Sequence, residues 1–126
     1  MKLLLPAAIA AVLFAVAAAP QDTPRGQQLF ERRCSGCHSL TQDKEGPRLG
    51  GVYGRVSGTV ESFPYSEALR NARITWNSES LEKWLSGPDR FVPGADMTFS
   101  LENADERAAI IAWLKETRKS ATAVEH

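Results

Sequence analysis

The sequence has few of the residues that build disulfide-linked or zinc-binding domains, because its 126 residues include only two cysteines and two histidines. Two cysteines allow at most one disulfide, which excludes a disulfide framework. The 15 lysines and arginines balance the 15 aspartates and glutamates. Nucleic-acid binding usually requires a basic excess, so this balance argues against it. No segment alternates polar and apolar residues over four or more positions, which argues against strands.

A long apolar run occurs at the N-terminus, where Lys2 is followed by apolar residues from Leu3 to Pro20. Small residues gather at its end and offer cleavage sites after Ala17 or Ala18. This pattern predicts a cleaved signal peptide over residues 1–19 and export to the periplasm. The alternative is an uncleaved membrane anchor, since the run reaches the lower length limit of a membrane span.

The remaining residues, 20–126, are predicted to form one all-α domain with three to five helices and long loops. Its core is expected over about residues 25–117, followed by a frayed tail after Ser120. Apolar spacing and capping residues predict helices over 25–33, 66–71, from Asn77 or Ser78 to Gly87, and 104–117. Glycine and proline place irregular loops over 41–59 and 88–99. Loops of this length in so small a domain need something to pack on.

The two cysteines and a histidine lie together in the stretch Cys34-Ser-Gly-Cys37-His38. Cys-x-x-Cys-His is the attachment motif of c-type haem. Two thiols on one helical turn can each bond one vinyl group of haem, and the next residue directs its imidazole to the iron. The motif therefore predicts one covalently bound haem c per chain, and the loops would wrap around it.

Three other readings of this motif are weaker. A structural zinc site needs about four ligands, and only the terminal His126 remains. A thioredoxin-like redox pair belongs in a βαβ pattern, which is absent. A plain disulfide between Cys34 and Cys37 would close only a small loop.

The second axial ligand decides between an electron carrier and a site that binds gases or peroxide. After the N-terminal segment the chain has one methionine, Met97, in the turn-rich stretch Val-Pro-Gly-Ala-Asp-Met-Thr-Phe. Because His126 ends a polar tail, Met97 is the better candidate. Histidine and methionine ligation favours ferrous haem and raises the reduction potential. Gly46-Pro47 offers a backbone carbonyl that can hold His38 in one tautomer.

The chain resembles the class I monohaem cytochromes c, of the mitochondrial and related bacterial branch, from about residue 26 to 114. The matching strings are CSGCH, GPRLGGVYGR, FPYSEAL, ITW, LEKWLSGPDRFVPGADMTF and ERAAIIAWL. The resemblance implies the cytochrome c fold, with thioethers at Cys34 and Cys37 and axial ligation by His38 and Met97.

The resemblance also assigns roles that spacing alone does not give. The Pro47 carbonyl would accept the His38 ring proton, and three residues would bind the haem propionates: Arg55, Tyr65 and Trp76. Gly26 and Phe30 would pack against Ile110 and Trp113 where the terminal helices cross. Phe99 would cover the exposed haem edge.

Several positions depart from the family pattern. Trp84 replaces a tyrosine that approaches the methionine sulfur, Leu69 replaces a polar residue, and Ala95 replaces a threonine. Asp89 and Asp96 stand where mitochondrial members carry lysines that dock acidic partners. The positive patch is therefore expected to be weaker and to consist of Lys44, Arg48 and Arg90.

The implied function is electron transfer rather than enzymatic catalysis. A monomer would shuttle single electrons between respiratory or photosynthetic redox complexes. Its donor would be a quinol-oxidising complex and its acceptor a terminal oxidase or reductase. It would meet the membrane only through these partners or through an uncleaved signal segment. The alternative is a haem peroxidase or gas sensor in which Met97 is displaced.

Overall fold

A computed structural model describes residues 2–15 and 22–124 of the chain. Five helices follow one another in the described residues: α1 (Asp22–Arg33), α2 (Glu67–Ala72), α3 (Ser78–Ser86), α4 (Pro88–Phe91) and α5 (Ala104–Val124). The only strand-like feature there is one antiparallel bridge between Val56 and Thr75. The expected all-α class is thus confirmed.

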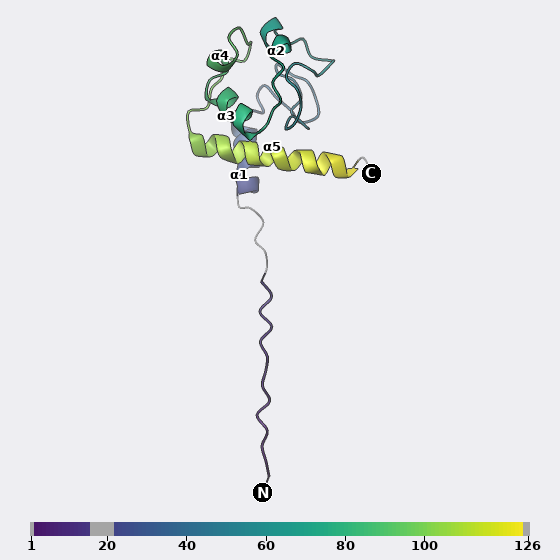
Figure 1. The fold of residues 1–126 in the computed structure, drawn as a ribbon, viewed down its shortest axis with the longest axis vertical. Coiled ribbons are helices and arrows are strands. Elements are labelled where there is room, and N and C mark those ends of the chain that lie inside the picture. Colours follow the sequence, from purple (N-terminus) through teal and green to yellow (C-terminus); the bar gives the residue numbers. More distant parts are fainter. Residues whose placement is uncertain (1, 16–21, 125–126) are drawn as a thin grey trace.

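Helices α1 and α5 cross and pack on each other, and α2, α3 and α4 lie on the far side of α5 from the start of α1 (Figure 1). The crossing buries Leu29 and Ile110 almost completely, at 2% and 1% exposure. The rings of Phe30 and Trp113 pack with centroids 4.9 Å apart. Gly26 lies where a side chain would run into the backbone carbonyl of Ala109. The contact predicted for the terminal helices is therefore present.

Capping residues set the ends of the short helices. Ser66 caps α2 by accepting a hydrogen bond from the Leu69 N–H at 3.2 Å. Asn77 caps α3 and forms a reciprocal capping box with Ser80. Gly87 ends α3 and begins α4, where Pro88 takes the first helical position. The starts of α2 and α3 match the sequence prediction, whereas α4 was not predicted.

Three boundaries differ from the prediction. Helix α1 begins at Asp22 rather than residue 25, since Pro24 is tolerated within the first turn. The segment expected to be entirely loop contains α4. Helix α5 continues to Val124, beyond the predicted end at 117 and into the predicted frayed tail. No glycine or proline follows Thr117 to stop it.

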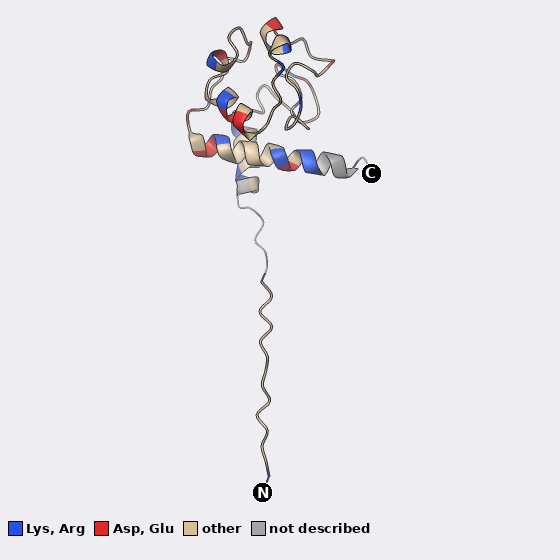
Figure 2. Ribbon diagram, viewed as in Figure 1, with Lys and Arg blue, Asp and Glu red and all other residues tan. Residues whose placement is uncertain are grey.

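Charges complement the helix dipole at the N-terminal end of α5. Asp105 and Glu106 occupy its first turn, where Figure 2 shows acidic residues, and acidic groups stabilise a helix N-terminus. The last turn carries no basic residue, so the helix dipole does not account for the extension of α5 to Val124.

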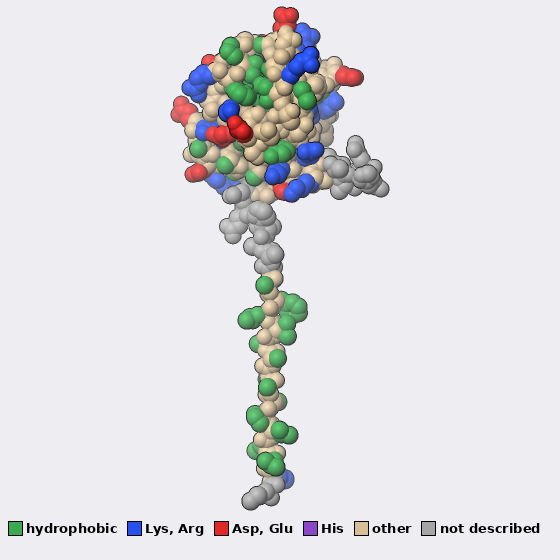
Figure 3. Space-filling view, viewed as in Figure 1, with side chains coloured by type: hydrophobic (Ala, Val, Ile, Leu, Met, Phe, Trp, Pro, Cys, Tyr) green, Lys and Arg blue, Asp and Glu red, His purple; other side chains and the backbone are tan. Residues whose placement is uncertain are grey.

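The N-terminal residues 2–15 run as an extended segment away from the helices, and hydrophobic side chains lie along it (Figure 3). Leu3, Leu4 and Leu5 are each more than nine-tenths exposed. The cleavage positions expected at Ala17 and Ala18 lie outside the described residues, as does His126. None of the described helices has both the length and the hydropathy that crossing a membrane requires.

The crossing of α1 and α5 gives a direct test of packing. In Gly26→Ala the new Cβ would lie 2.7 Å from the Trp113 Cβ as well as against the Ala109 carbonyl. We expect the helices to be forced apart, with a loss of about 1–3 kcal/mol in the free energy of unfolding. Guanidinium denaturation of the mature protein measures this loss.

The matched control is Gly36→Ala, since no atom lies within 4 Å of the Cβ that it adds. Equal stability of Gly26→Ala and the parent would contradict the packing described for this crossing.

Candidate functional site

The two cysteines and His38 lie in a turn that prolongs α1. The Cys34 N–H donates to the Phe30 carbonyl at 2.8 Å, and the His38 N–H donates to the Cys34 carbonyl at 2.9 Å. Helix-like bonding thus continues for one turn beyond Arg33. It brings two thiols and an imidazole to the end of a helix that the core holds in place.

Neither thiol behaves as a disulfide or a redox-active pair. Cys34 and Cys37 are both free. Burial, with a smaller contribution from Cys37, raises the pKa of Cys34 to about 11. A hydrogen bond to Glu45 at 3.3 Å is the main cause of the raised pKa of Cys37. Reactive dithiols need a lowered pKa, so the thioredoxin-like alternative finds no support.

The His38 ring is fixed in one tautomer. Its Nδ1 lies 2.8 Å from the Pro47 carbonyl oxygen, and a carbonyl can only accept, so Nδ1 carries the proton. The lone pair therefore resides on Nε2. Burial is the main influence on this ring and lowers the pKa of His38, which favours the neutral imidazole that metals bind. The contact expected between His38 and Pro47 is present.

Gly46 supports the same ring from behind. A Cβ at this position would lie against the His38 Cε1 and 2.6 Å from its Nδ1. The Gly46 N–H also donates to the Cys37 carbonyl at 2.8 Å. The loop before Pro47 is therefore bound to the cysteine turn, with only a hydrogen atom separating its backbone from the imidazole.

A cavity of about 620 Å³ opens beside these groups and is bordered by Cys34, Cys37, His38 and Met97. Its volume falls in the range of cofactor sites, about 300–1,000 Å³. Met97 is half-buried and packs against the core, in the loop between α4 and α5. Apolar side chains from the loops and helices form much of the remaining wall, and they include Phe30, Leu49, Val52, Leu69, Leu81, Trp84, Leu85, Ile110 and Leu114.

Arg55 places a partly buried cation on the cavity wall. The Arg55 guanidinium donates to the Arg48 carbonyl at 2.8 Å and to the Gly50 carbonyl at 2.6 Å. No carboxylate among the described residues pairs with it. Burial is the main cause of the lowered pKa of Arg55. A partly buried cation that lacks a carboxylate partner favours an anion in the cavity.

Tyr65 and Trp76 border the same cavity as Arg55. The Tyr65 hydroxyl oxygen accepts from the Val60 N–H at 3.3 Å, so its O–H can still donate. Trp76 is buried, and its ring lies 5.3 Å from that of Trp84. The three residues predicted to bind propionates are thus all placed on one cavity, where their donors can meet an anionic group.

These features fit a covalently attached haem. Two free thiols, a neutral imidazole and a thioether all face a cavity of cofactor size, and a cation lies on its wall. A zinc site does not fit, because the described residues contain no cluster of three or more potential ligands. The site is therefore suited to haem rather than to a bare metal ion.

The departures from the family pattern also lie on the cavity. Leu69 and Trp84 both border it. The Trp84 side chain forms no hydrogen bond to Met97 or to any other described residue, and its ring packs against that of Trp76. Phe99 lies at the rim and is 41% exposed, as expected for a residue at the open edge.

Sequence reasoning missed two features of the site. Gly46 was noted only as the neighbour of Pro47, and its tight contact with His38 depends on how the loop folds back. Asp43 also borders the cavity and hydrogen-bonds the Ser62 hydroxyl, 19 residues away. A contact over that separation leaves no local signal in the sequence.

Comparisons with known proteins agree with the geometry. Residues 24–118 match the family model described as Cytochrome c. Cytochrome c of Chlamydomonas reinhardtii is 42% identical over 99 residues, which cover 75% of this chain and 88% of that protein. Cytochrome c of Euglena viridis is 46% identical over 97 residues, covering 75% and 95%. The solved structure of cytochrome cH from Methylobacterium extorquens superposes with a TM-score of 0.71 at 32% identity, covering 75% and 98%.

The tight packing behind His38 makes a testable prediction. In Gly46→Ala the added methyl group would occupy the space of the imidazole. We expect His38 to turn away and lose its bond to Pro47, so that the purified protein carries less haem and the low-spin spectrum is lost. Haem content per chain and the visible spectrum measure this, and a parent-like result would contradict the predicted role of Gly46.

Proposed function

The chain belongs to the cytochrome c family, whose members carry electrons on one covalently attached haem c, and we propose His38 and Met97 as its two axial ligands. The observation that carries the proposal is the shared cavity: the free Nε2 of His38 and the thioether of Met97 both border it. The remaining mature-chain histidine, His126, lies outside the described residues.

Different residues of the chain would hold different parts of the haem. Cys34 and Cys37 would bond it by adding their S–H groups across two vinyl groups, and Pro47 would orient the ligand His38. Arg55, Tyr65 and Trp76 would satisfy the propionates. When bound, the haem iron supplies a reversible one-electron change of state. Apolar walls exclude water and penalise the extra charge of the ferric form, which raises the potential.

We also place the protein in the periplasm. The support is the N-terminal sequence, with a single cation, an apolar run and small residues at its end. Covalent attachment of haem outside the cytoplasm agrees with a periplasmic location. Electrons would come from a quinol-oxidising complex and pass to a terminal oxidase or reductase.

The rim around Phe99 is the proposed docking surface for these partners. Phe99 is one of the few large hydrophobic side chains that the helical domain exposes. Two aromatic or apolar faces brought together at the haem edge give brief contact over a small area, as transient redox complexes require. Electron transfer then needs no rearrangement of the chain.

The weak positive patch of Lys44, Arg48 and Arg90 stays a prediction. Of the three cations predicted to form it, only Lys44 borders the cavity, and its ammonium donates to the Ser35 carbonyl at 2.6 Å. Arg48 lies 3.8 Å from Asp43, and Arg90 donates to the Ser86 carbonyl. These cations are each engaged by their own neighbours.

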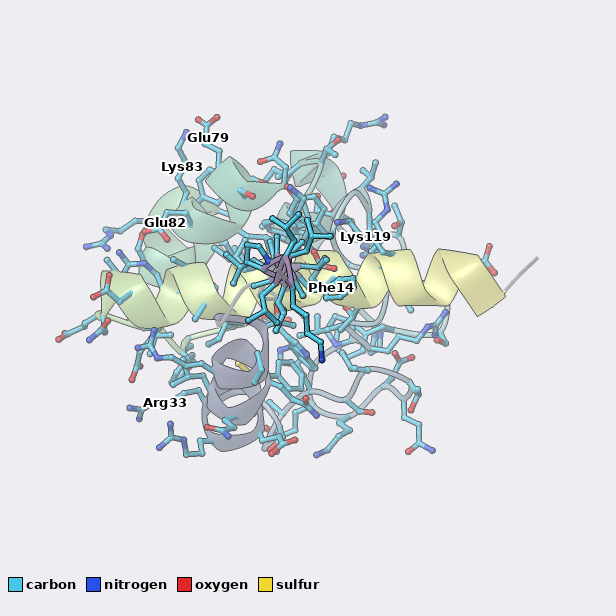
Figure 4. All side chains as sticks on the ribbon, turned by 90° about the horizontal axis from the view of Figure 1, so that it is seen from below. Phe14, Arg33, Glu79, Glu82, Lys83 and Lys119 are labelled. Atoms are coloured by element: carbon cyan, nitrogen blue, oxygen red, sulfur yellow. The ribbon has the colours of Figure 1, made fainter. Side chains whose placement is uncertain are left out.

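Exposed acidic groups lie on the methionine loop and on the helices that flank it, and one of them, Asp96, borders the cavity. Glu79 and Glu82 on α3 are neutralised by Lys83 and Arg107, and Glu79 and Lys83 project together from α3 (Figure 4). Four exposed carboxylates between α4 and the start of α5 have no ion-pair partner among the described residues: Asp89, Asp96, Glu102 and Asp105. The proposed partner therefore presents cations opposite the methionine loop.

The axial assignment predicts the behaviour of Met97→Ala. Loss of the thioether opens the sixth position, so carbon monoxide and cyanide bind rapidly, and the reduction potential falls because the ligand that favours ferrous haem is gone. Stopped-flow ligand binding and a redox titration measure both effects. Ser100→Ala changes an exposed residue of the same loop and should behave as the parent.

Rapid ligand binding by the parent would favour the peroxidase or sensor alternative, since a displaceable Met97 would then admit small molecules. A Met97→Ala protein with the parent's spectrum and potential would show that Met97 is not a ligand.

The acidic rim predicts opposite salt effects with reagents of opposite charge. Oxidation of the reduced protein by a cationic cobalt complex should slow severalfold as salt rises, whereas oxidation by ferricyanide should accelerate. Asp89→Asn with Asp96→Asn should flatten both dependences. Glu31→Gln with Glu61→Gln removes as many charges elsewhere and should leave the slopes in place; equal slopes in both double variants would contradict the surface described.

A further inference from the structure

Asp43 joins two loops at the edge of the cavity. Its side chain is 20% exposed. One carboxylate oxygen accepts from the Arg48 N–H at 2.9 Å, and the other accepts from the Ser62 hydroxyl. The Arg48 guanidinium completes the cluster by donating to the Ser62 Oγ at 3.0 Å. The loop after His38 is thereby tied to the loop before α2.

The same cluster extends to Arg55 through the backbone of Arg48. The N–H of Arg48 is held by Asp43, and its carbonyl accepts from the Arg55 Nη1 at 2.8 Å. The Arg55 Nη2 donates to the Gly50 carbonyl in the same loop. The guanidinium is therefore positioned by two carbonyls, and Asp43 bonds directly to the residue that supplies the first of them, Arg48, while backbone bonds to Ser39 and Leu40 hold the stretch that supplies the second.

Asp43, Ser62 and Arg55 all border the cavity, and Arg55 has no direct hydrogen bond to Asp43. We propose that Asp43 is a positioning residue: its carboxylate fixes the 43–50 loop, and this loop holds the Arg55 guanidinium where the haem propionates bind. The inference rests on the proposed function, since it takes the cavity to be the haem site.

The carboxylate stays ionised at neutral pH. The Ser62 hydrogen bond is the largest cause of the lowered pKa of Asp43, and the Arg48 N–H adds to it. The cations that face it are Arg48 and Arg55. Asp43 thus acts in two separable ways: by its bonds, which order the loop, and by its charge, which lies near the cavity.

Two substitutions separate these actions in the haem-loaded protein. Asp43→Asn removes the charge but keeps an oxygen that can accept from the Arg48 N–H, whereas Asp43→Ala removes both. Glu61→Gln is the control, because Glu61 neighbours Ser62, is exposed and has no bonding partner among the described residues. It therefore removes one charge from the same loop without touching the cluster.

Amide hydrogen exchange measures how firmly the 43–50 loop is held. In Asp43→Ala the Arg48 amide should exchange about 10- to 100-fold faster, as expected for loss of a bond to a charged acceptor. In Asp43→Asn its rate should stay within a few-fold of the parent, and in Glu61→Gln it should not change. Equal exchange rates of the Arg48 amide in the alanine and asparagine variants would contradict the proposal that Asp43 fixes the loop.

The reduction potential tests whether the Arg55 guanidinium keeps its place beside the propionates. A purely structural role of Asp43 would leave the potential unchanged. Asparagine removes a negative charge that favours ferric haem, so the potential should rise. In the alanine variant Arg55 also loses its place beside the propionates, and the potential should lie below that of the asparagine variant. In an Arg55→Leu background this difference should vanish, since the two changes act through one group.

A difference that persists without Arg55 would overturn the proposal, as would a Glu61→Gln shift equal to that of Asp43→Asn. The haem content of the parent is measured first: a parent without covalent haem contradicts the proposed function itself. A haem-loaded parent whose Asp43 variants behave alike contradicts only the role of Asp43.

Discussion

A cavity of about 620 Å³ lies at the centre of a small, loop-rich domain, and the need to fill it shapes the rest of the molecule. The apolar side chains on its walls lack packing partners on the cavity side until a cofactor fills the space. The described helices pack chiefly through α1, α3 and α5, while long loops complete the walls. Covalent haem therefore completes the core as well as carrying the electron.

Different parts of the cavity wall have different chemistry. At one position the turn after α1 presents Cys34, Cys37 and His38, and Gly46 and Pro47 hold the imidazole from behind. At another position on the wall, Arg55 stays partly buried with only carbonyls as partners. A ligand that is apolar across its face, metallic at its centre and anionic at its edge satisfies both. Few ligands other than haem combine these properties.

Local chemistry explains which parts of the structure were predictable from the sequence. The motif at Cys34–His38 and the caps at Ser66 and Asn77 depend only on residues a few positions apart. These features could therefore be predicted from the sequence alone. The family resemblance supplied the long-range contacts of Gly26 and the placement of Arg55, Tyr65 and Trp76 on one cavity. Helix α4 was missed because its four residues lie in a proline- and glycine-rich stretch. The Asp43–Ser62 contact was missed because only the folded loops bring the two together.

Positions that depart from the family pattern occur both on the cavity, at Leu69 and Trp84, and on the exposed surface, at Asp89 and Asp96. The exposed aspartates lie apart from the cysteine turn and from the α1–α5 crossing, where Gly26 allows the two helices to approach closely. Partner choice can thus change without disturbing the haem site, because the docking charges lie on exposed residues that take no part in the core.

The most direct test of covalent haem attachment is the intact mass of the protein purified from a host that matures c-type cytochromes. A mature chain heavier by one haem, which remains bound after acid and organic extraction, is the predicted result. A colourless protein with the mass of the polypeptide alone would contradict it.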